Sequence, residues 1–396
     1  MIEAPHTTSS GDARAQAIDR AEAAMRQHAD ANIVITNAID RARDVSSGSG
    51  VLDGFTVALK DMIDVAGLPT TRGSALYGGL DALATAPCVD ALQQAGAVIV
   101  AKVNLHEFAY GVTNENPHWG DVVNPRHPDL IAGGSSGGTA AAIAAGIARV
   151  GLGTDTAGSI RMPAACCGVV GLRPRTGRVS GRGVAGLAPS FDVVGPMAAT
   201  VEDTARTWAV LSGEPVPDAA ALHGLVIGVI EGCAAADRLR ALGAEIRSFE
   251  LPGDLLDPFW TMFRAEATRT HEGTFPRNAA DYSANVRAKL ENASGVDAGG
   301  YQRARDEIDA LRGEVARRMH GLDLLVSDTL GCAAPPVGCD EVAIRDDLGR
   351  LVAPFSALDL PALAIGNLQI VARTEADALA AGLAWEREVG EIPPPW

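Results

Sequence analysis

The chain has 396 residues, 47% of them hydrophobic, and its formal net charge at pH 7 is −16. This length and apolar content allow a large buried core, in one big α/β domain or two smaller ones. The acidic charge is not broken by any basic cluster, which argues against nucleic acid or an anionic membrane as a partner.

Other features of the sequence indicate a cytoplasmic protein. Residues 1–19 lack the apolar core of a signal peptide, and no apolar run is long enough to cross a bilayer. The six cysteines form no CxxC pair and have no histidine at metal-ligand spacing, as expected in a reducing compartment. We therefore expect a chain without membrane contact.

The N-terminal residues predict a helical surface layer. Residues 12–28 follow the helical period, with alanines and Ile18 on one face and charges on the other. A second short helix is predicted over about 33–44, and SSGSG at 46–50 is typical of a flexible connector. Residues 1–45 should thus form a helical layer of the same domain as the rest of the chain.

The next segment predicts core strands followed by a long loop. GFTVALKDMI, from Gly54, is β-rich, and Lys60 ends its apolar run. A helix is expected over 87–95 and a buried strand over 97–103. His106 and Glu107, in the polar loop that follows, suggest HExxH, but position 110 is tyrosine, so we predict no metal.

Residues 132–168 contain two glycine–serine turns around a small-residue helix. GGSSGG at 133–138 is followed by a predicted helix over about 139–149, the apolar strand VGLGT and the turn TAGS at 156–159. This helix and strand return the chain so that Ser135 and Ser159 can meet, because glycines allow tight turns and close backbone approach. Asp155 and Arg161 flank Ser159 and predict an ion pair or a turn-forming pair.

The remaining residues alternate strands with helices. A helix is predicted over 201–213, then a βαβ-like unit with a helix over about 233–242, mostly helix over 255–320, and finally two apolar strands and a C-terminal helix. No GxGxxG follows the first strand and no GxxxxGK[ST] occurs, so we predict no nucleotide or other cofactor.

These motifs resemble the amidase signature family. The resemblance extends from VALKDMIDVAGLPTT through GGSSGG and GLGTDTAGSIRMPA to SFDVVGPMA, roughly residues 51–200, and is weaker toward the C-terminus. It implies an α/β fold in one large domain, with a mixed, mostly parallel sheet covered by helices on both faces. Residues 51–396 would then form the signature domain, with its core at about 51–200.

The resemblance also implies roles for individual residues. Ser159 corresponds to the acyl-forming nucleophile, Ser135 to a bridging serine after a cis peptide bond, and Lys60 to the base. The oxyanion hole would be formed by N–H groups of the turn that ends at Ser159: Thr156, Ala157, Gly158 and Ser159 itself. Substrate contacts are expected from the long polar loop and the first glycine turn: Phe108, Tyr110, Trp119 and Gly134.

A lysine acts as a base only when it is neutral, and its ordinary pKa lies well above 7. Burial at the end of an apolar strand lowers the pKa of Lys60, which makes the position suitable. No GxSxG is present, so a Ser-His-Asp site is not indicated. Thr154 and Ser136 are candidates either for the hydrogen-bond network of the site or for bonds to nearby backbone groups.

The sequence therefore predicts an amidase that hydrolyses a small carboxamide or ureido compound through a serine acyl-enzyme, without a cofactor. The glutaminase subunit of a tRNA-dependent amidotransferase is the alternative within the family. A catalytically silent binding or scaffold protein would be expected to lack one of Lys60, Ser135 and Ser159, and all three are present. Met162 offers no charged anchor for a substrate carboxylate. A homodimer is the assembly we expect.

Overall fold

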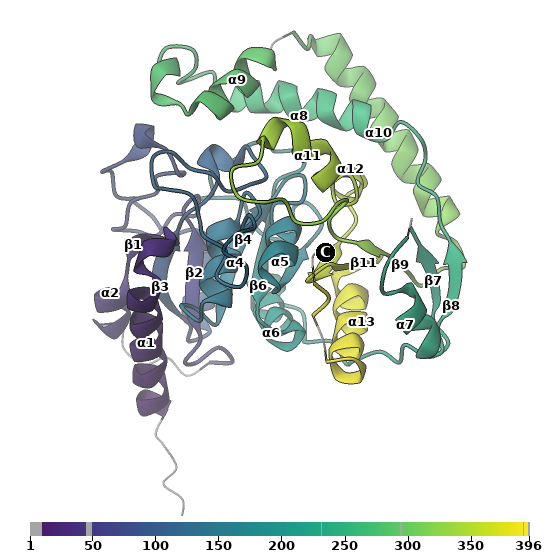
Figure 1. Cartoon of the computed structure of the whole chain (residues 1–396), viewed down its shortest axis with the longest axis horizontal. Helices are drawn as coiled ribbons and strands as arrows, with labels where there is room; N and C mark the ends of the chain where they lie inside the picture. The colour runs from purple at the N-terminus through teal and green to yellow at the C-terminus, as the bar shows by residue number, and fades with distance from the viewer. Residues whose placement is uncertain (1–9, 45–49, 231, 294, 391, 395–396) are drawn as a thin grey trace, which may run out of the picture.

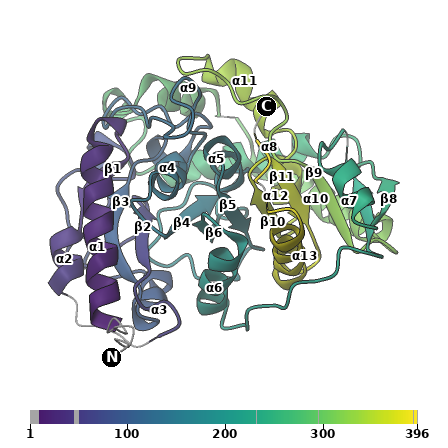
Figure 2. The same ribbon diagram turned by 60° about the horizontal axis from the view of Figure 1, so that its bottom comes forward.

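A computed structural model describes residues 10–44, 50–230, 232–293, 295–390 and 392–394. In this part of the chain one sheet of 11 strands lies between two layers of helices, as Figures 1 and 2 show from two sides. The strand order is β1-β3-β2-β4-β6-β5-β10-β11-β9-β7-β8. The predicted α/β fold with a mixed central sheet is confirmed. The connector predicted at 46–50 lies outside the described residues except for Gly50.

The strands are short and mostly buried. Their bounds are β1 (Val34–Asn37), β2 (Thr56–Lys60), β3 (Val98–Val103), β4 (Val150–Asp155), β5 (Val170–Arg173), β6 (Val193–Ala198), β7 (Val226–Val229), β8 (Glu245–Ser248), β9 (Leu324–Asp328), β10 (Ala362–Ile365) and β11 (Leu368–Val371). Parallel pairs form two groups, β3–β2–β4 and β9–β7–β8, toward the two ends of the sheet. Antiparallel pairs join these groups through β6, β5, β10 and β11.

The helices pack on both faces of the sheet and along one edge. Their bounds are α1 (Ser10–Gln27), α2 (Ile39–Asp44), α3 (Pro87–Gln94), α4 (Gly137–Ala144), α5 (Arg161–Cys167), α6 (Val201–Ser212), α7 (Ala236–Ala241), α8 (Leu256–His271), α9 (Ala284–Asn292), α10 (Ala298–Arg318), α11 (Glu341–Gly349), α12 (Ala353–Ala357) and α13 (Glu375–Glu388). Helices α1, α4 and α5 share one apolar cluster with the sheet. Helices α6 and α13 pack on the sheet within another cluster.

Two helix predictions need correction. Residues 33–44 form strand β1 followed by helix α2, because Val34 to Asn37 pair antiparallel with β3 and complete the edge of the sheet. The N-terminal layer is therefore not purely helical. The helix predicted over 139–149 begins at Gly137, inside the glycine-rich turn, and ends at Ala144. Gly146, with φ at 73°, then turns the chain into β4.

Helices α8, α9 and α10 form an arc over one edge of the sheet (Figure 1). Their apolar side chains share a cluster with Tyr110, Leu187 and Phe191, which come from loops at that edge. The cluster buries several aromatic rings, each of which removes a large apolar area from water. The arc thus covers the side of the sheet at which the C-terminal ends of β2 and β4 lie, and the candidate site is on this side.

Three further features of the described residues concern hydropathy, cysteines and possible metal ligands. None of their helices has both the length and the apolar character needed to cross a membrane. All six cysteines are unpaired; Cys88, Cys166, Cys167 and Cys233 are buried, whereas Cys339 is half-buried and Cys332 exposed. No three histidine, cysteine or acidic side chains in the described ranges gather as metal ligands would.

Candidate active site

Lys60 is the last residue of β2 and is completely buried. Its Nζ donates hydrogen bonds to Ser135 Oγ and to Thr154 Oγ1, each at 2.7 Å. Desolvation lowers the pKa of Lys60 to about 7, although the charges of Asp155 and Asp192 oppose the shift. A large share of Lys60 is therefore neutral near pH 7, and its amine can accept a proton.

Ser135 lies in the turn before α4 and is also completely buried. The Gly134–Ser135 peptide bond is cis, as expected. A Cβ on Gly134 would lie 2.8 Å from the carbonyl oxygen of Gly111, so a side chain there would collide with backbone. Gly134 thus allows close packing of the turn, and it is not among the residues that line the cavity described below. Its predicted contact with substrate is not supported.

Ser159 follows β4 in the second turn and precedes α5. Its carbonyl oxygen accepts a hydrogen bond from Ser136 N at 3.1 Å, which ties the two serine turns together. Within the described chain its Oγ makes no hydrogen bond. The predicted contact of Ser135 Oγ with Lys60 is confirmed, while the contact of Ser135 Oγ with Ser159 Oγ remains a prediction.

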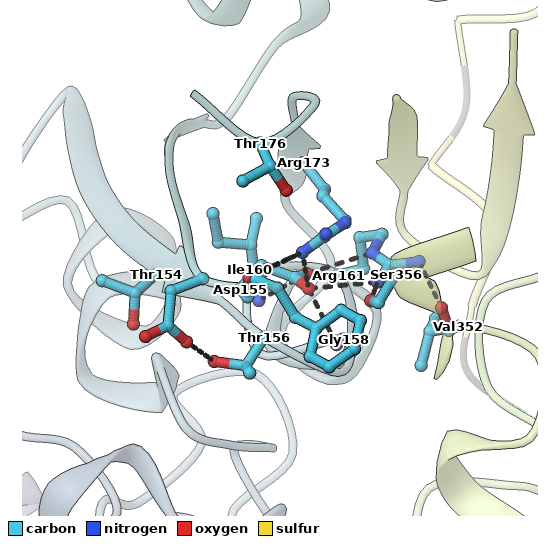
Figure 3. Close-up of polar contacts among 12 residues, drawn as sticks. Thr154, Asp155, Thr156, Gly158, Ile160, Arg161, Arg173, Thr176, Val352 and Ser356 are labelled. Carbon is cyan, nitrogen blue, oxygen red and sulfur yellow. Dashed lines mark hydrogen bonds and ion pairs between the residues drawn. The ribbon is translucent and has the colours of Figure 1, made fainter. Parts of the chain in front are cut away.

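Asp155 holds the second turn in place, as Figure 3 shows. Its carboxylate accepts hydrogen bonds from Gly158 N at 2.8 Å and Ile160 N at 3.1 Å. It also pairs with Arg161, whose Nε lies 3.0 Å away, and with Arg173 Nη1 at 3.1 Å. Burial alone would raise the pKa of Asp155, but these arginines and the Gly158 N–H overcome it and hold the pKa well below its usual range. The predicted Asp155–Arg161 ion pair is confirmed.

The turn therefore differs from the predicted oxyanion hole at one position. Gly158 already donates its N–H to Asp155, so this group is not free to face a substrate. Gly158 has φ at 115°, and a Cβ there would lie 2.3 Å from Val352, so glycine is required for the turn itself. In the described chain the N–H groups of Thr156, Ala157 and Ser159 donate to no protein atom, and they remain candidate donors.

Asp192 is a residue near the site that the sequence analysis missed. It accepts a hydrogen bond from Thr156 Oγ1 at 2.6 Å, and its second oxygen accepts from Leu187 N and Ala188 N. Its charge also acts on Lys60 and favours the protonated amine. The motif SFDVVGPMA, in which it lies, carries the resemblance, but the sequence alone does not show where the carboxylate points.

Ser159 opens into a cavity of about 340 Å³. Its lining combines the second serine turn with aromatic, aliphatic and charged side chains from α8, α9 and α11: Ala109, Tyr110, Gly111, Val112, Thr156, Ala157, Ser159, Met162, Leu187, Trp260, Phe263, Arg264, Ala288, Lys289, Asn292, Ala293, Glu341, Val342, Arg345 and Gly349. The ring of Phe263 packs edge to face against Tyr110, with ring centroids 5.4 Å apart, and against Trp260, with centroids 5.3 Å apart. We call these three rings the aromatic wall.

Of the predicted wall residues, only Tyr110 lines the cavity. Phe108 is buried against the rings of Tyr77, His271 and Tyr282 and is not part of the lining. Trp119 is 37% exposed and also lies outside the lining. The structure therefore places Phe108 and Trp119 outside this lining, and their contact with substrate stays a prediction.

The fold and the site define an α/β protein with a buried lysine hydrogen-bonded to one serine and a second serine facing an aromatic cavity. Residues 8–223, more than half of the chain, match the family model described as Amidase. The chain therefore belongs to the amidase family.

Similarity to individual proteins agrees with this assignment. The chain is 31% identical to a glutamyl-tRNA(Gln) amidotransferase subunit of Chloroflexus aurantiacus over 428 aligned positions, which cover 90% of this chain and 87% of that protein. An indoleacetamide hydrolase of Pseudomonas syringae is 43% identical over 194 positions, 47% of this chain and 44% of that protein.

Among solved structures, a crystal structure of an amidase superposes with a TM-score of 0.85 at 32% identity, covering 97% and 96% of the two chains.

Two other glutamyl-tRNA(Gln) amidotransferase subunits, from Salinibacter ruber and Acidobacterium capsulatum, are matched over only 32% and 48% of their own length.

Proposed function

We propose that the protein hydrolyses a carbon–nitrogen amide bond through an acyl-enzyme on Ser159, with Ser135 and Lys60 as the proton relay. The observation that carries the proposal is the buried Lys60 amine, with a pKa near 7 and a 2.7 Å hydrogen bond to Ser135 Oγ. Strongly perturbed buried lysines are typical of functional sites, and a lysine that acts as a general base near pH 7 must have such a lowered pKa.

In the proposed first step, Ser159 Oγ attacks the amide carbonyl carbon. The hydroxyl proton passes through Ser135 to Lys60 Nζ, and the N–H groups of Thr156, Ala157 and Ser159 stabilise the oxyanion. Lys60 then returns the proton through Ser135 to the leaving nitrogen as the C–N bond breaks. In the second step, water attacks the acyl ester, gives a proton to the same relay and restores the Ser159 hydroxyl. The net reaction is amide plus water to acid plus amine or ammonia.

The cavity supports a small substrate with an apolar acyl part. Its volume of about 340 Å³ lies at the lower end of the range for small-molecule sites, and the aromatic wall favours a flat or apolar group. We therefore propose a small carboxamide or ureido compound as substrate. The proposal includes a cytoplasmic location and excludes nucleic acid and membrane partners, with the net charge of −16 as support. Light scattering would test the proposed homodimer, which has twice the 40.8 kDa mass of the chain.

The glutaminase subunit of a tRNA-dependent amidotransferase is a second candidate. The similarity to a glutamyl-tRNA(Gln) amidotransferase subunit over most of the chain favours it. In that case the enzyme would release ammonia from glutamine, and a partner protein would increase the rate. Glutamine turnover with and without such a partner separates the two candidates.

The direct test is an ammonia assay over a panel of small primary amides, ureido compounds and glutamine. We expect hydrolysis of at least one small amide by the wild type and none by Ser159→Ala. Ser180→Ala, in an exposed loop residue, serves as the matched serine control. Turnover that survives in Ser159→Ala would refute the proposed nucleophile.

A further inference from the structure

The cavity has a positive lining in a strongly acidic protein. Three basic side chains, Arg264, Lys289 and Arg345, line it together with one acid, Glu341. The chain as a whole carries a formal charge of −16. A local reversal of sign inside a cavity concentrates ligands of the opposite charge, because the walls exclude screening water.

The only acid in this lining, Glu341, is fully engaged. Its Oε2 pairs with Lys289 Nζ at 2.8 Å and accepts from Asn285 Nδ2 at 3.1 Å, and its Oε1 accepts from Val112 N at 3.2 Å. Lys289 also donates to the carbonyl oxygen of Tyr110 at 2.8 Å. This buried pair holds the wall in place, and its two charges cancel.

The two arginines remain without a strong partner. Arg264, on α8, is exposed and forms no ion pair with any described residue. Among the described residues, Arg345 on α11 pairs only with the adjacent Asp346, whose Oδ1 lies 3.5 Å from Arg345 Nε, and Asp346 is outside the lining. Figure 1 shows α8 and α11 on the same side of the sheet edge, and both contribute to the one cavity.

Both arginines lie close enough to the aromatic wall for their charges to affect the pKa of Tyr110. Burial raises the pKa of Tyr110 to about 12, and the charges of Arg345 and Arg264 oppose this shift. Arg264 is also one helical turn from Trp260, a spacing that places two side chains on the same face of α8. The positive charge therefore borders the wall that would contact the acyl part of a substrate.

The position beside the nucleophile carries no charge. Met162, three residues after Ser159, lines the cavity and is apolar, as the sequence indicated. An anionic group on the substrate would thus not be held next to the reacting amide. The positive charges of the lining that are left to hold such a group are those of the two arginines.

We propose that the substrate carries a carboxylate, separated from the scissile amide by an apolar spacer, and that Arg264 and Arg345 bind this carboxylate while the spacer contacts the aromatic wall. This inference rests on the proposed amide hydrolysis at Ser159. Guanidinium groups suit the role because they are always charged and offer paired N–H donors to a carboxylate.

The test measures binding separately from turnover. Phenylacetamide bearing a para-carboxylate and its para-methyl-ester counterpart are titrated by calorimetry into Ser159→Ala, which cannot consume them. Because partly exposed pairs are modest and screened by salt, we expect roughly 10-fold tighter binding of the carboxylate at low salt, and a smaller preference at high salt. Arg264→Gln and Arg345→Gln, each in the Ser159→Ala background, should reduce this preference.

A matched control and a charge reversal complete the design. Arg269→Gln changes an exposed arginine of the same helix that stacks over Tyr301 outside the cavity, and it should keep the preference. Arg264→Glu should favour a para-aminomethyl analogue instead. Equal or weaker binding of the carboxylate than of the ester would overturn this proposal. If the wild type hydrolyses no amide bond, including that of the neutral methyl-ester compound, the proposed function fails instead. The two failures are thus distinguishable.

Discussion

Replacing Lys60 with methionine should make the folded protein more stable while removing its activity. The pKa of Lys60 falls from its ordinary 10.5 to about 7 on folding, so the buried amine disfavours the native state wherever the unfolded lysine is protonated. At pH 7 that cost is about 4 kcal/mol, at 1.36 kcal/mol per pH unit of pKa difference. Methionine removes the cost and also two hydrogen bonds, worth about 1 kcal/mol each. The net gain expected at pH 7 is about 2 kcal/mol.

The pH dependence of this gain isolates the lysine. A base with a depressed pKa costs stability most below its folded pKa, and the cost disappears as pH rises through its unfolded pKa. At pH 9.5 the cost is only about 1.4 kcal/mol, so the gain from Lys60→Met should fall by roughly 3 kcal/mol between pH 7 and pH 9.5. The lost hydrogen bonds contribute about equally at both pH values and cancel. Urea unfolding of wild type and variant at the two pH values measures this difference.

Lys102 on the neighbouring strand is a matched control. It is as buried as Lys60 but pairs with Asp61 Oδ1 at 2.5 Å. Lys102→Met leaves that carboxylate buried and unpaired, which should destabilise the protein by about 3–5 kcal/mol. If Lys60→Met changes the free energy of unfolding by the same amount at pH 7 and at pH 9.5, that result would refute the idea that folding lowers the pKa of Lys60.

Three further predictions follow from the site. Ser135→Ala should lower kcat by about 10²–10⁴-fold, the usual range for a proton relay, and less than Ser159→Ala does; a rate within twofold of wild type would contradict the relay. The value of kcat/KM should fall about tenfold per pH unit below pH 7, because protonation of Lys60 removes the base; a profile that stays flat to pH 5 would exclude it. Asp155→Asn should lower the free energy of unfolding by about 3–5 kcal/mol, since Arg161 and Arg173 lose their carboxylate. Asp203→Asn, which breaks the more exposed pair with Arg149, should cost about 1 kcal/mol or less, and equal losses in the two variants would contradict the assigned role of Asp155.

The reacting side chains were predictable because the motifs that hold them are local. Ser135 and Ser159 lie in two glycine turns joined by one helix and one strand, and Lys60 ends a strand that pairs directly with that strand. The ion-paired residues Asp155 and Arg161 are six positions apart, at the two ends of the same turn. For the serines and the ion pair, the short chain between the residues fixes their separation, while Lys60 needs only the pairing of β2 with β4.

The cavity could not be predicted in the same way. Trp260, Phe263 and Lys289 lie more than 100 residues after Ser159, and they reach the site only because α8 and α9 pack over the sheet edge. Their sequence pattern is that of ordinary amphipathic helices. The place of Phe108 has a related cause, since its ring packs against His271 and Tyr282, which lie far later in the chain.

Other features of the structure depend on tertiary contacts. The mostly apolar segment 33–39 suits either a helix or a strand, and pairing of Val34 with Val103 decides for the strand. The antiparallel middle of the sheet depends partly on the two-residue connection between β10 and β11, which permits only a hairpin. Likewise, the Gly158 N–H could be assigned to Asp155 only once the direction of that carboxylate was known.

The central claim is that Ser159 is the nucleophile and that Lys60 activates it. A serine-directed fluorophosphonate, followed by mass spectrometry of the digested protein, tests this claim most directly. We predict one adduct per chain, located on Ser159, absent from Ser159→Ala and formed far more slowly in Lys60→Met. An adduct on Ser135 or on any other serine, or labelling of Ser159 at the same rate in Lys60→Met, would contradict the account.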